Sequence, residues 1–271
     1  MTTLERTRDG WNDIAGGYDD FVTPANMRLG TEALKRVGLR PGIRFLDVAA
    51  GSGALSIPAA RLGAHVLATD SSPAMLERLE ARAHAEDLAH VQTRLTDACA
   101  LELEDDLFDV SASQHGVHDL ARALCEMTRV TKPGGRVALI ACGPPHQVET
   151  LSFFMGAMYA VGRHLSWATE HPAVPTFPMA QRHQLLGALS GVGLREISVE
   201  TIAQQIWFGS GKQLWNLVAN SDPTVAGLTA LLTTEQRRLV EEVLDGMLRE
   251  RAAGNGFAVL TDAGNIGLGT K

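Results

Sequence analysis

Cysteine pairs, long apolar runs and clusters of basic residues are all missing from this chain of 271 residues. Its three cysteines, Cys99, Cys125 and Cys142, form no Cys-x-x-Cys pair, which argues against a disulfide framework and against a thiolate metal site. No stretch approaches the roughly 18 uninterrupted apolar residues of a membrane-spanning helix. The first residues, Met1–Arg6, lack the apolar core of a signal peptide. We therefore expect a cytoplasmic protein without a membrane span and without a metal.

The charge balance excludes another class of function. The net charge is −7 and no Lys/Arg cluster is present, whereas a nucleic-acid binder needs a basic face. Hydrophobic residues make up 45% of the chain, which is ordinary for a globular core. We expect one large α/β domain, or a domain with a lid, and no nucleic-acid partner.

A glycine-rich turn is the most informative feature that is present. It joins an expected buried strand at Arg44–Val48 to an expected helix at Ala54–Leu62. Gly51 and Gly53 lack a Cβ, so the backbone can turn sharply and lie against a ligand. The helix that follows offers unpaired N–H groups at its start. This arrangement predicts a nucleoside-binding β-α-β unit.

Two acidic residues narrow the choice of nucleoside. Asp70 follows the next expected strand, His65–Thr69, and its carboxylate can accept hydrogen bonds from two adjacent ribose hydroxyls. Asp47 lies just before the glycines, where it would repel a pyrophosphate and attract an ammonium or sulfonium group. The third glycine of the dinucleotide fingerprint is replaced by Ser56. The pattern therefore favours a cationic nucleoside over a dinucleotide.

The run Asp47–Gly53 resembles motif I of the class I S-adenosylmethionine (SAM) methyltransferases, with Ala49 in place of its first glycine. Similar segments follow in the order of that family, at Leu95–Ala98, Phe108–His115 and Arg129–Ile140. The resemblance covers residues 10–142 and is closest to the ubiquinone/menaquinone-type small-molecule methyltransferases. It implies an α/β fold with a doubly wound, mostly parallel, seven-stranded Rossmann-like sheet and helical lid insertions, and SAM as the cofactor.

The expected organisation follows from where the alternation of strands and helices stops, after Gly143. The next stretch is rich in aromatic residues and Met, which suit a substrate lid but equally an ordinary core. We expect a single methyltransferase domain over 1–271, with N-terminal helices in 1–40, a SAM-binding core in 41–145, and substrate-lid insertions at 146–178 and 209–255.

The resemblance implies a set of cofactor-binding residues at the ends of the expected strands. In the family, an acid at the position of Asp97 meets the adenine amino group, although a turn role is open for it. Tyr18 resembles a tyrosine that covers the cofactor, by a cation–π contact or by simple packing. The expected cofactor-binding residues are Tyr18, Asp47, Ala49, Gly51, Gly53, Asp70, Ser71, Asp97, Ala98, Ser113 and Gln114.

His115 and His118 are the candidate catalytic residues. Histidine titrates near neutral pH, and His115 follows the fourth expected strand, so it could take a proton from a hydroxyl nucleophile. The other interpretation is that it only shapes the pocket or binds the cofactor through its backbone.

The predicted function is SAM-dependent methyl transfer to O, N or C of a small apolar or aromatic molecule. A NAD-dependent oxidoreductase and a non-catalytic SAM-binding protein are the alternatives. The acceptor and the oligomeric state stay open.

Overall fold

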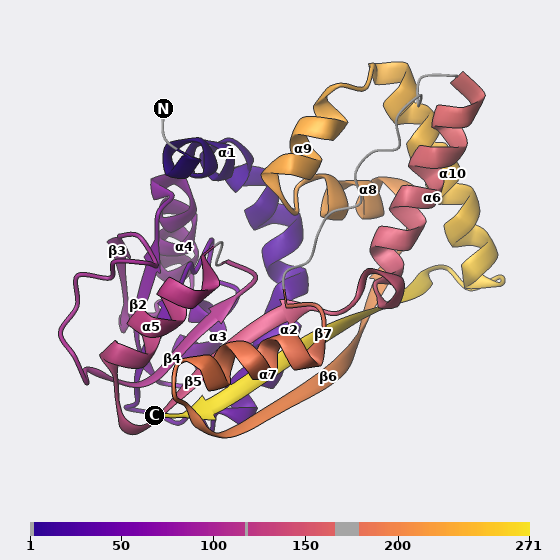
Figure 1. Cartoon of the computed structure of the whole chain (residues 1–271). Helices are drawn as coiled ribbons and strands as arrows, with labels where there is room; N and C mark the ends of the chain where they lie inside the picture. Colours follow the sequence, from indigo (N-terminus) through magenta and orange to yellow (C-terminus); the bar gives the residue numbers. More distant parts are fainter. Residues whose placement is uncertain (1–2, 117–118, 166–178) are drawn as a thin grey trace.

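In the computed structural model, strands and helices build one sheet with helices packed beside it (Figure 1). The structure describes residues 3–116, 119–165 and 179–271. Within them the strands are β1 (Arg44–Val48), β2 (His65–Asp70), β3 (Val91–Leu95), β4 (Phe108–Gln114), β5 (Thr131–Cys142), β6 (Arg195–Phe208) and β7 (Ala258–Thr270).

These strands form one seven-stranded sheet in the order β3-β2-β1-β4-β5-β7-β6. The first five pair in parallel, and β7 runs antiparallel to both β5 and β6. This confirms the expected doubly wound, mostly parallel sheet. From β1 the chain continues to β2 and β3 on one side, and from β4 it continues to β5 on the other side, so the strand order reverses between β1 and β4. Open α/β sheets bind ligands at the carboxyl ends of the two strands beside such a point.

Helices cover both faces of the sheet because neighbouring residues of a strand point to opposite sides. Phe45 and Leu46 are both fully buried, yet they belong to different apolar clusters, one with α2 and α3 and the other with α5 and α7. The helices are α1 (Thr3–Gly17), a π-helix η1 (Tyr18–Val22), α2 (Thr23–Arg36), α3 (Ser56–Arg61), α4 (Pro73–Ala85), α5 (Leu120–Val130), a 3-10 turn η2 (Pro145–Gln147), α6 (Glu149–Leu165), α7 (Arg182–Gly191), α8 (Gly211–Ala219), α9 (Pro223–Ala230) and α10 (Thr234–Ala252).

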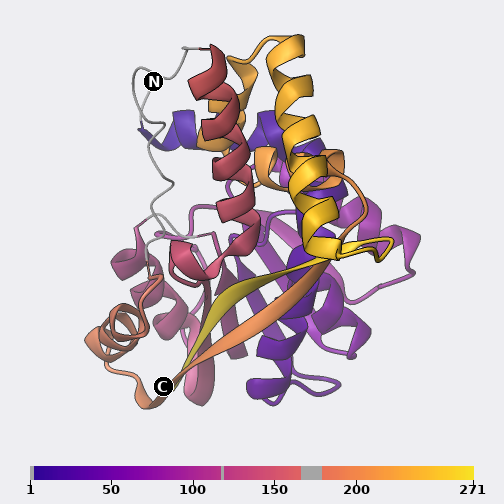
Figure 2. The ribbon, with the colours of Figure 1, turned by 90° about the vertical axis from the view of Figure 1, so that its right-hand side faces the viewer.

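Four helices, α6, α8, α9 and α10, form a separate cluster at the far end of the long strands β6 and β7 (Figures 1 and 2). They come from the two stretches in which the sequence predicts insertions. Thr233 and Gln236 form a capping box at the start of α10. Within the described residues, no helix is both long and apolar enough to cross a membrane.

The Pro133-Gly134-Gly135 turn lies inside β5. Between Phe108 and Val110 the partner on β5 advances from Thr131 to Arg136, so the turn bulges out of the ladder.

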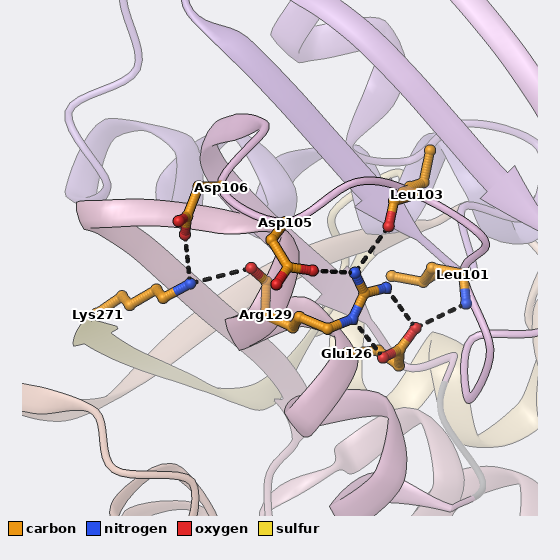
Figure 3. A network of polar contacts seen from close by, with 7 residues as sticks. All are labelled: Leu101, Leu103, Asp105, Asp106, Glu126, Arg129 and Lys271. Atoms are coloured by element: carbon orange, nitrogen blue, oxygen red, sulfur yellow. Dashed lines mark hydrogen bonds and ion pairs between the residues drawn. The ribbon is translucent and has the colours of Figure 1, made fainter.

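Arg129 fixes the loop that follows β3 (Figure 3). Its guanidinium donates to the carbonyl of Leu103 at 2.7 Å and pairs with Asp105 and Glu126. Glu126 in turn accepts a hydrogen bond from the N–H of Leu101 at 2.9 Å. The loop that carries Asp97 is therefore tied to α5.

Candidate active site

A pocket of about 450 Å³ opens at the carboxyl ends of β1, β2, β3 and β4. Ten of the predicted site residues line it: Tyr18, Asp47, Ala49, Gly51, Asp70, Ser71, Asp97, Ala98, Gln114 and His115. The sheet thus brings together residues that lie almost a hundred positions apart in the sequence, at the place where open α/β sheets bind ligands.

Asp70 is held on the pocket wall by two backbone hydrogen bonds. One carboxylate oxygen accepts from the N–H of Gly51 at 2.8 Å and the other from the N–H of Ser72 at 2.9 Å. Burial is the main cause that raises the pKa of this carboxyl group above its usual value. Each oxygen of a carboxylate has a second lone pair, so the group can still accept from two hydroxyls.

The glycine turn leaves room beside that carboxylate. Gly51 has φ +53°, a conformation that disfavours larger residues, and a Cβ there would lie 3.6 Å from the Tyr18 ring, facing the pocket. The bare backbone therefore provides the close approach that a bound nucleoside needs.

Asp47 is buried at the end of β1 and accepts a hydrogen bond from the Ser56 hydroxyl at 2.6 Å. Burial, with a smaller effect from the charge of Asp70, raises the pKa of Asp47 to about 7. Ser56 therefore has a physical role at the position where a dinucleotide site has glycine. A buried carboxylate with one partner gains from a cationic ligand.

Ala49 departs from motif I, and the structure accommodates it. The residue has φ +57°, and a Cβ at Gly116 would lie only 2.4 Å from the Ala49 methyl group. Gly116 lines the pocket beside Ala49. A glycine after β4 thus compensates for the extra methyl group, a contact that no local sequence pattern reports.

Aromatic residues from the N-terminal helices line the pocket opposite the sheet. Tyr18 and Trp11 meet edge to face with ring centroids 5.7 Å apart, and both line the pocket. Burial raises the pKa of the Tyr18 phenol to about 12, and its hydroxyl bonds to the side chain of Asn26. Sequence reasoning missed Trp11, although its spacing of seven from Tyr18 puts both on one face of a helix.

Asp97 makes a turn contact and lies on the wall of the pocket. Its Oδ1 accepts from the N–H of Cys99 at 2.9 Å, which is a turn contact, and the residue also lines the pocket with Ala98.

His115 follows β4 in a left-handed conformation with φ +58°. Its N–H donates to the carbonyl of Ile140 at 3.0 Å, and Nδ1 lies 3.3 Å from the Cys142 Sγ. Burial lowers the pKa of His115 to about 4, so its ring is neutral near pH 7. The second candidate base, His118, lies outside the described residues.

Two of the predicted residues are not among those that line the pocket. Gly53, with φ +100°, leaves space for Ile57 and Leu79, which a Cβ there would meet at 3.0 and 3.1 Å. Ser113 is only 2% exposed. Alternate residues of a strand point to opposite faces, and Ser113 lies next to Gln114, which lines the pocket. No group of three His, Cys, Asp or Glu residues that could hold a metal occurs in the described part of the chain.

The fold is of the doubly wound α/β class, and its pocket lies at the carboxyl ends of the parallel strands. The model of the methyltransferase domain family matches residues 46–139. The chain is 34% identical over 167 residues to a demethylmenaquinone methyltransferase of Streptomyces avermitilis, which covers 58% of this chain and 70% of that protein. The chain belongs to this methyltransferase family.

Two further comparisons show how much of the chain is similar to known proteins. Over 151 residues the chain is 41% identical to Rv1405c of Mycobacterium tuberculosis, which covers 55% of this chain and 52% of that protein. The chain thus spans about half the length of the curated relatives that match it at this identity. The YcgJ protein of Bacillus subtilis shares the fold with a TM-score of 0.55 at 17% identity, over 91% of this chain and 97% of that one.

Proposed function

We propose that this chain transfers a methyl group from SAM to an oxygen, nitrogen or carbon atom of a small apolar or aromatic molecule, with S-adenosylhomocysteine as the second product. The observation that carries the proposal is the Asp70 carboxylate. It is fixed by Gly51 and Ser72 on the wall of the pocket, and it keeps lone pairs for two hydroxyls. In a chain of a methyltransferase family, those hydroxyls are the ribose hydroxyls of SAM.

The remaining pocket residues fit the rest of the cofactor. Asp47 would hold the ammonium group, Asp97 and the Ala98 backbone the adenine, and Tyr18 would cover the sulfonium face. When bound, SAM supplies an electrophilic methyl group on a positively charged sulfur. Asp47 lies beside the glycine turn where a pyrophosphate would bind, and Ser56 takes the place of the third glycine of the dinucleotide fingerprint; both disfavour the NAD-dependent alternative.

The protein's own contribution is alignment and proton transfer. Holding two reactants in line is worth roughly 7–11 kcal/mol in the best cases. The neutral His115 ring would accept the proton of an acceptor hydroxyl at a ring nitrogen. Because burial makes this imidazole a weak base, it suits an acidic hydroxyl, such as a phenol, better than an aliphatic alcohol.

We place the acceptor between the pocket and the helical cluster of α6 and α8–α10. Helix α8 contacts η1 and α9 contacts α1, and these N-terminal elements carry Tyr18 and Trp11 into the pocket. The insertions at 146–178 and 209–255 would then form the acceptor lid, of which 166–178 lie outside the described residues. Hydrogen exchange should slow in these segments only when acceptor and S-adenosylhomocysteine bind together. Protection confined to 41–145 would contradict this lid.

Calorimetry with SAM, S-adenosylhomocysteine and NAD tests the cofactor. We expect binding of the first two, no binding of NAD, and weaker SAM binding in Asp70→Ala. Release of S-adenosylhomocysteine then identifies the acceptor in a screen of quinols, phenols, polyketides and indoles. Quinols come first, because the S. avermitilis relative is named a demethylmenaquinone methyltransferase. SAM binding without release of product from any acceptor would favour the non-catalytic alternative.

We also propose a cytoplasmic location. Cys99, Cys125 and Cys142 are all free thiols, as expected in a reducing compartment.

A further inference from the structure

The His115 ring has a thiol partner behind it. Its Nδ1 lies 3.3 Å from the Sγ of Cys142, near the end of β5, the strand that pairs with β4. His115 lines the pocket, whereas Cys142 is not among the lining residues. With Nδ1 occupied by the thiol, Nε2 is the ring nitrogen that remains for a ligand.

Both members of this pair are neutral. Burial raises the pKa of the Cys142 thiol to about 12 and lowers the pKa of His115 to about 4. A thiolate–imidazolium pair of the kind found in cysteine nucleophiles is therefore excluded near pH 7. The neutral ring has one proton, and the hydrogen bond to the thiol decides which nitrogen holds it.

Asp262 on β7 is a charged group that acts on the thiol. Its carboxylate oxygens accept hydrogen bonds from the backbone N–H of Thr150 at 3.0 Å and from the Thr150 hydroxyl at 2.5 Å. The charge of Asp262 acts on Cys142 and further raises the pKa of the thiol. A negative charge on that side favours the rotamer in which the S–H hydrogen points toward Asp262 and a sulfur lone pair points toward His115, at the 3.3 Å contact.

We propose that Cys142 is a positioning residue that accepts the Nδ1–H of His115 and so keeps Nε2 free to accept the proton of the methyl acceptor. The second half of this inference rests on the proposed function. In that step the hydroxyl proton of the acceptor passes to Nε2, and its electron pair stays on the acceptor oxygen as the nucleophile. The ring then holds one positive charge, with Nδ1–H still directed at sulfur.

The ring nitrogens of His115 report the contact directly, in protein without cofactor or acceptor. We would label histidine with ¹⁵N, record ring correlation spectra near pH 7, and assign His115 by its loss in His115→Gln. We expect the Nδ1–H form in the natural protein, a shift toward the Nε2–H form in Cys142→Ala, and the Nδ1–H form again in Cys142→Ser, whose hydroxyl is a better acceptor. Cys125→Ser, an exposed thiol on α5, is the matched control and should leave the spectrum unchanged.

An Nε2–H ring in the natural protein would overturn the proposal, and so would an unchanged ring in Cys142→Ala. The first measurement is made on the natural protein and needs only His115→Gln for the assignment, so the proposal can be refuted even if the Cys142 variants fail to fold. With an acceptor in hand, Cys142→Ala should lower kcat by roughly 2- to 10-fold, the worth of one ordinary hydrogen bond, at unchanged SAM affinity, and Cys142→Ser should restore it. If the ring shows the Nδ1–H form but no acceptor is methylated, the proposed function fails while the contact stands.

Discussion

The sheet region and the helical cluster bury different kinds of residue. At the strand ends of the sheet region the buried residues include polar and charged ones, among them Asp47, Ser52, Ser56 and Ser72. In the cluster, the buried residues of the described stretches 151–162 and 211–252 are apolar or glycine, with Phe154, Trp215 and Leu244 at its centre.

This difference in buried residues indicates different roles for the two regions. Buried polar groups are costly unless they are hydrogen-bonded, so a buried carboxylate on a pocket wall, as at Asp47, marks a site with a specific ligand. An apolar core costs nothing of this kind and is what any helical unit needs to fold. We infer that the sheet region binds and reacts, and that the cluster closes the acceptor side.

The division of roles between the two regions is tested most strongly by removing the proposed base, His115. His115→Ala should lower turnover on a hydroxyl acceptor by roughly 100- to 10,000-fold, because proton transfer is lost, and leave SAM affinity near that of the natural protein. Initial rates and calorimetry measure the two effects. His183→Ala, an exposed residue of α7, is the control. His118→Ala and the double variant should be measured beside it; natural rates in all three would show that neither histidine is the base.

A substitution in the core of the helical cluster should lower the stability of the protein rather than remove a catalytic group. Trp215 is 3% exposed and packs against Phe154 with ring centroids 5.4 Å apart. Trp215→Ala should reduce the free energy of unfolding by about 3–5 kcal/mol through a cavity in this core. Chemical denaturation measures it. Trp207→Ala, a change at a 44% exposed tryptophan on β6, should cost much less; equal losses would argue against a packed cluster.

The assignment of Asp70 to the ribose can be tested with two variants that each remove one carboxylate. Each charge-assisted hydrogen bond is worth roughly 1.5–3 kcal/mol, so Asp70→Ala should weaken SAM binding by about 10- to 1,000-fold. Asp109→Ala removes the same charge at the opposite end of the sheet, where Asp109 pairs with Lys132. Calorimetry should show unchanged SAM affinity for this second variant. A folded Asp70→Ala protein with natural affinity would refute the assignment.

The sequence was sufficient for the parts of the site that lie along single strand–turn units. Asp47, Gly51 and Asp70 could be predicted because parallel strands bring their carboxyl ends to one edge, whatever the loops between them do. The partners that meet only through tertiary pairing were out of reach. Gly116 beside Ala49, and Cys142 behind His115, depend on how the ends of neighbouring strands and loops lie together.

The acceptor was unpredictable for a different reason. Phe154, Met158 and Trp215 could line a substrate pocket or fill a core, and apolar composition alone does not distinguish the two. In the structure all three belong to the buried cluster, which leaves the choice of acceptor to the surfaces around it.

The smallest expected effect concerns the proton on Asp47. Burial raises the pKa of this group from 3.8 to about 7, so between those pH values the folded protein holds a proton that the unfolded chain has lost. Its contribution to stability therefore falls as pH rises from about 4 to about 7. The ammonium group of SAM favours the ionised form, so binding below pH 7 should release a proton, and affinity should rise with pH by up to about tenfold per unit and then level off.

Calorimetry at pH 6 in two buffers of different ionisation enthalpy measures this proton release. Asp47→Asn keeps an oxygen for the Ser56 hydroxyl but has no carboxyl proton to lose. The proton release on SAM binding should therefore drop to the contribution of Asp70, whose pKa is also raised. Adenosine, which has the ribose but no ammonium group, is the matched ligand and should release less than SAM from the natural protein. Equal proton release from the natural protein and from Asp47→Asn would show that Asp47 does not face the cation, and the preference of this pocket for a cationic nucleoside would need another source.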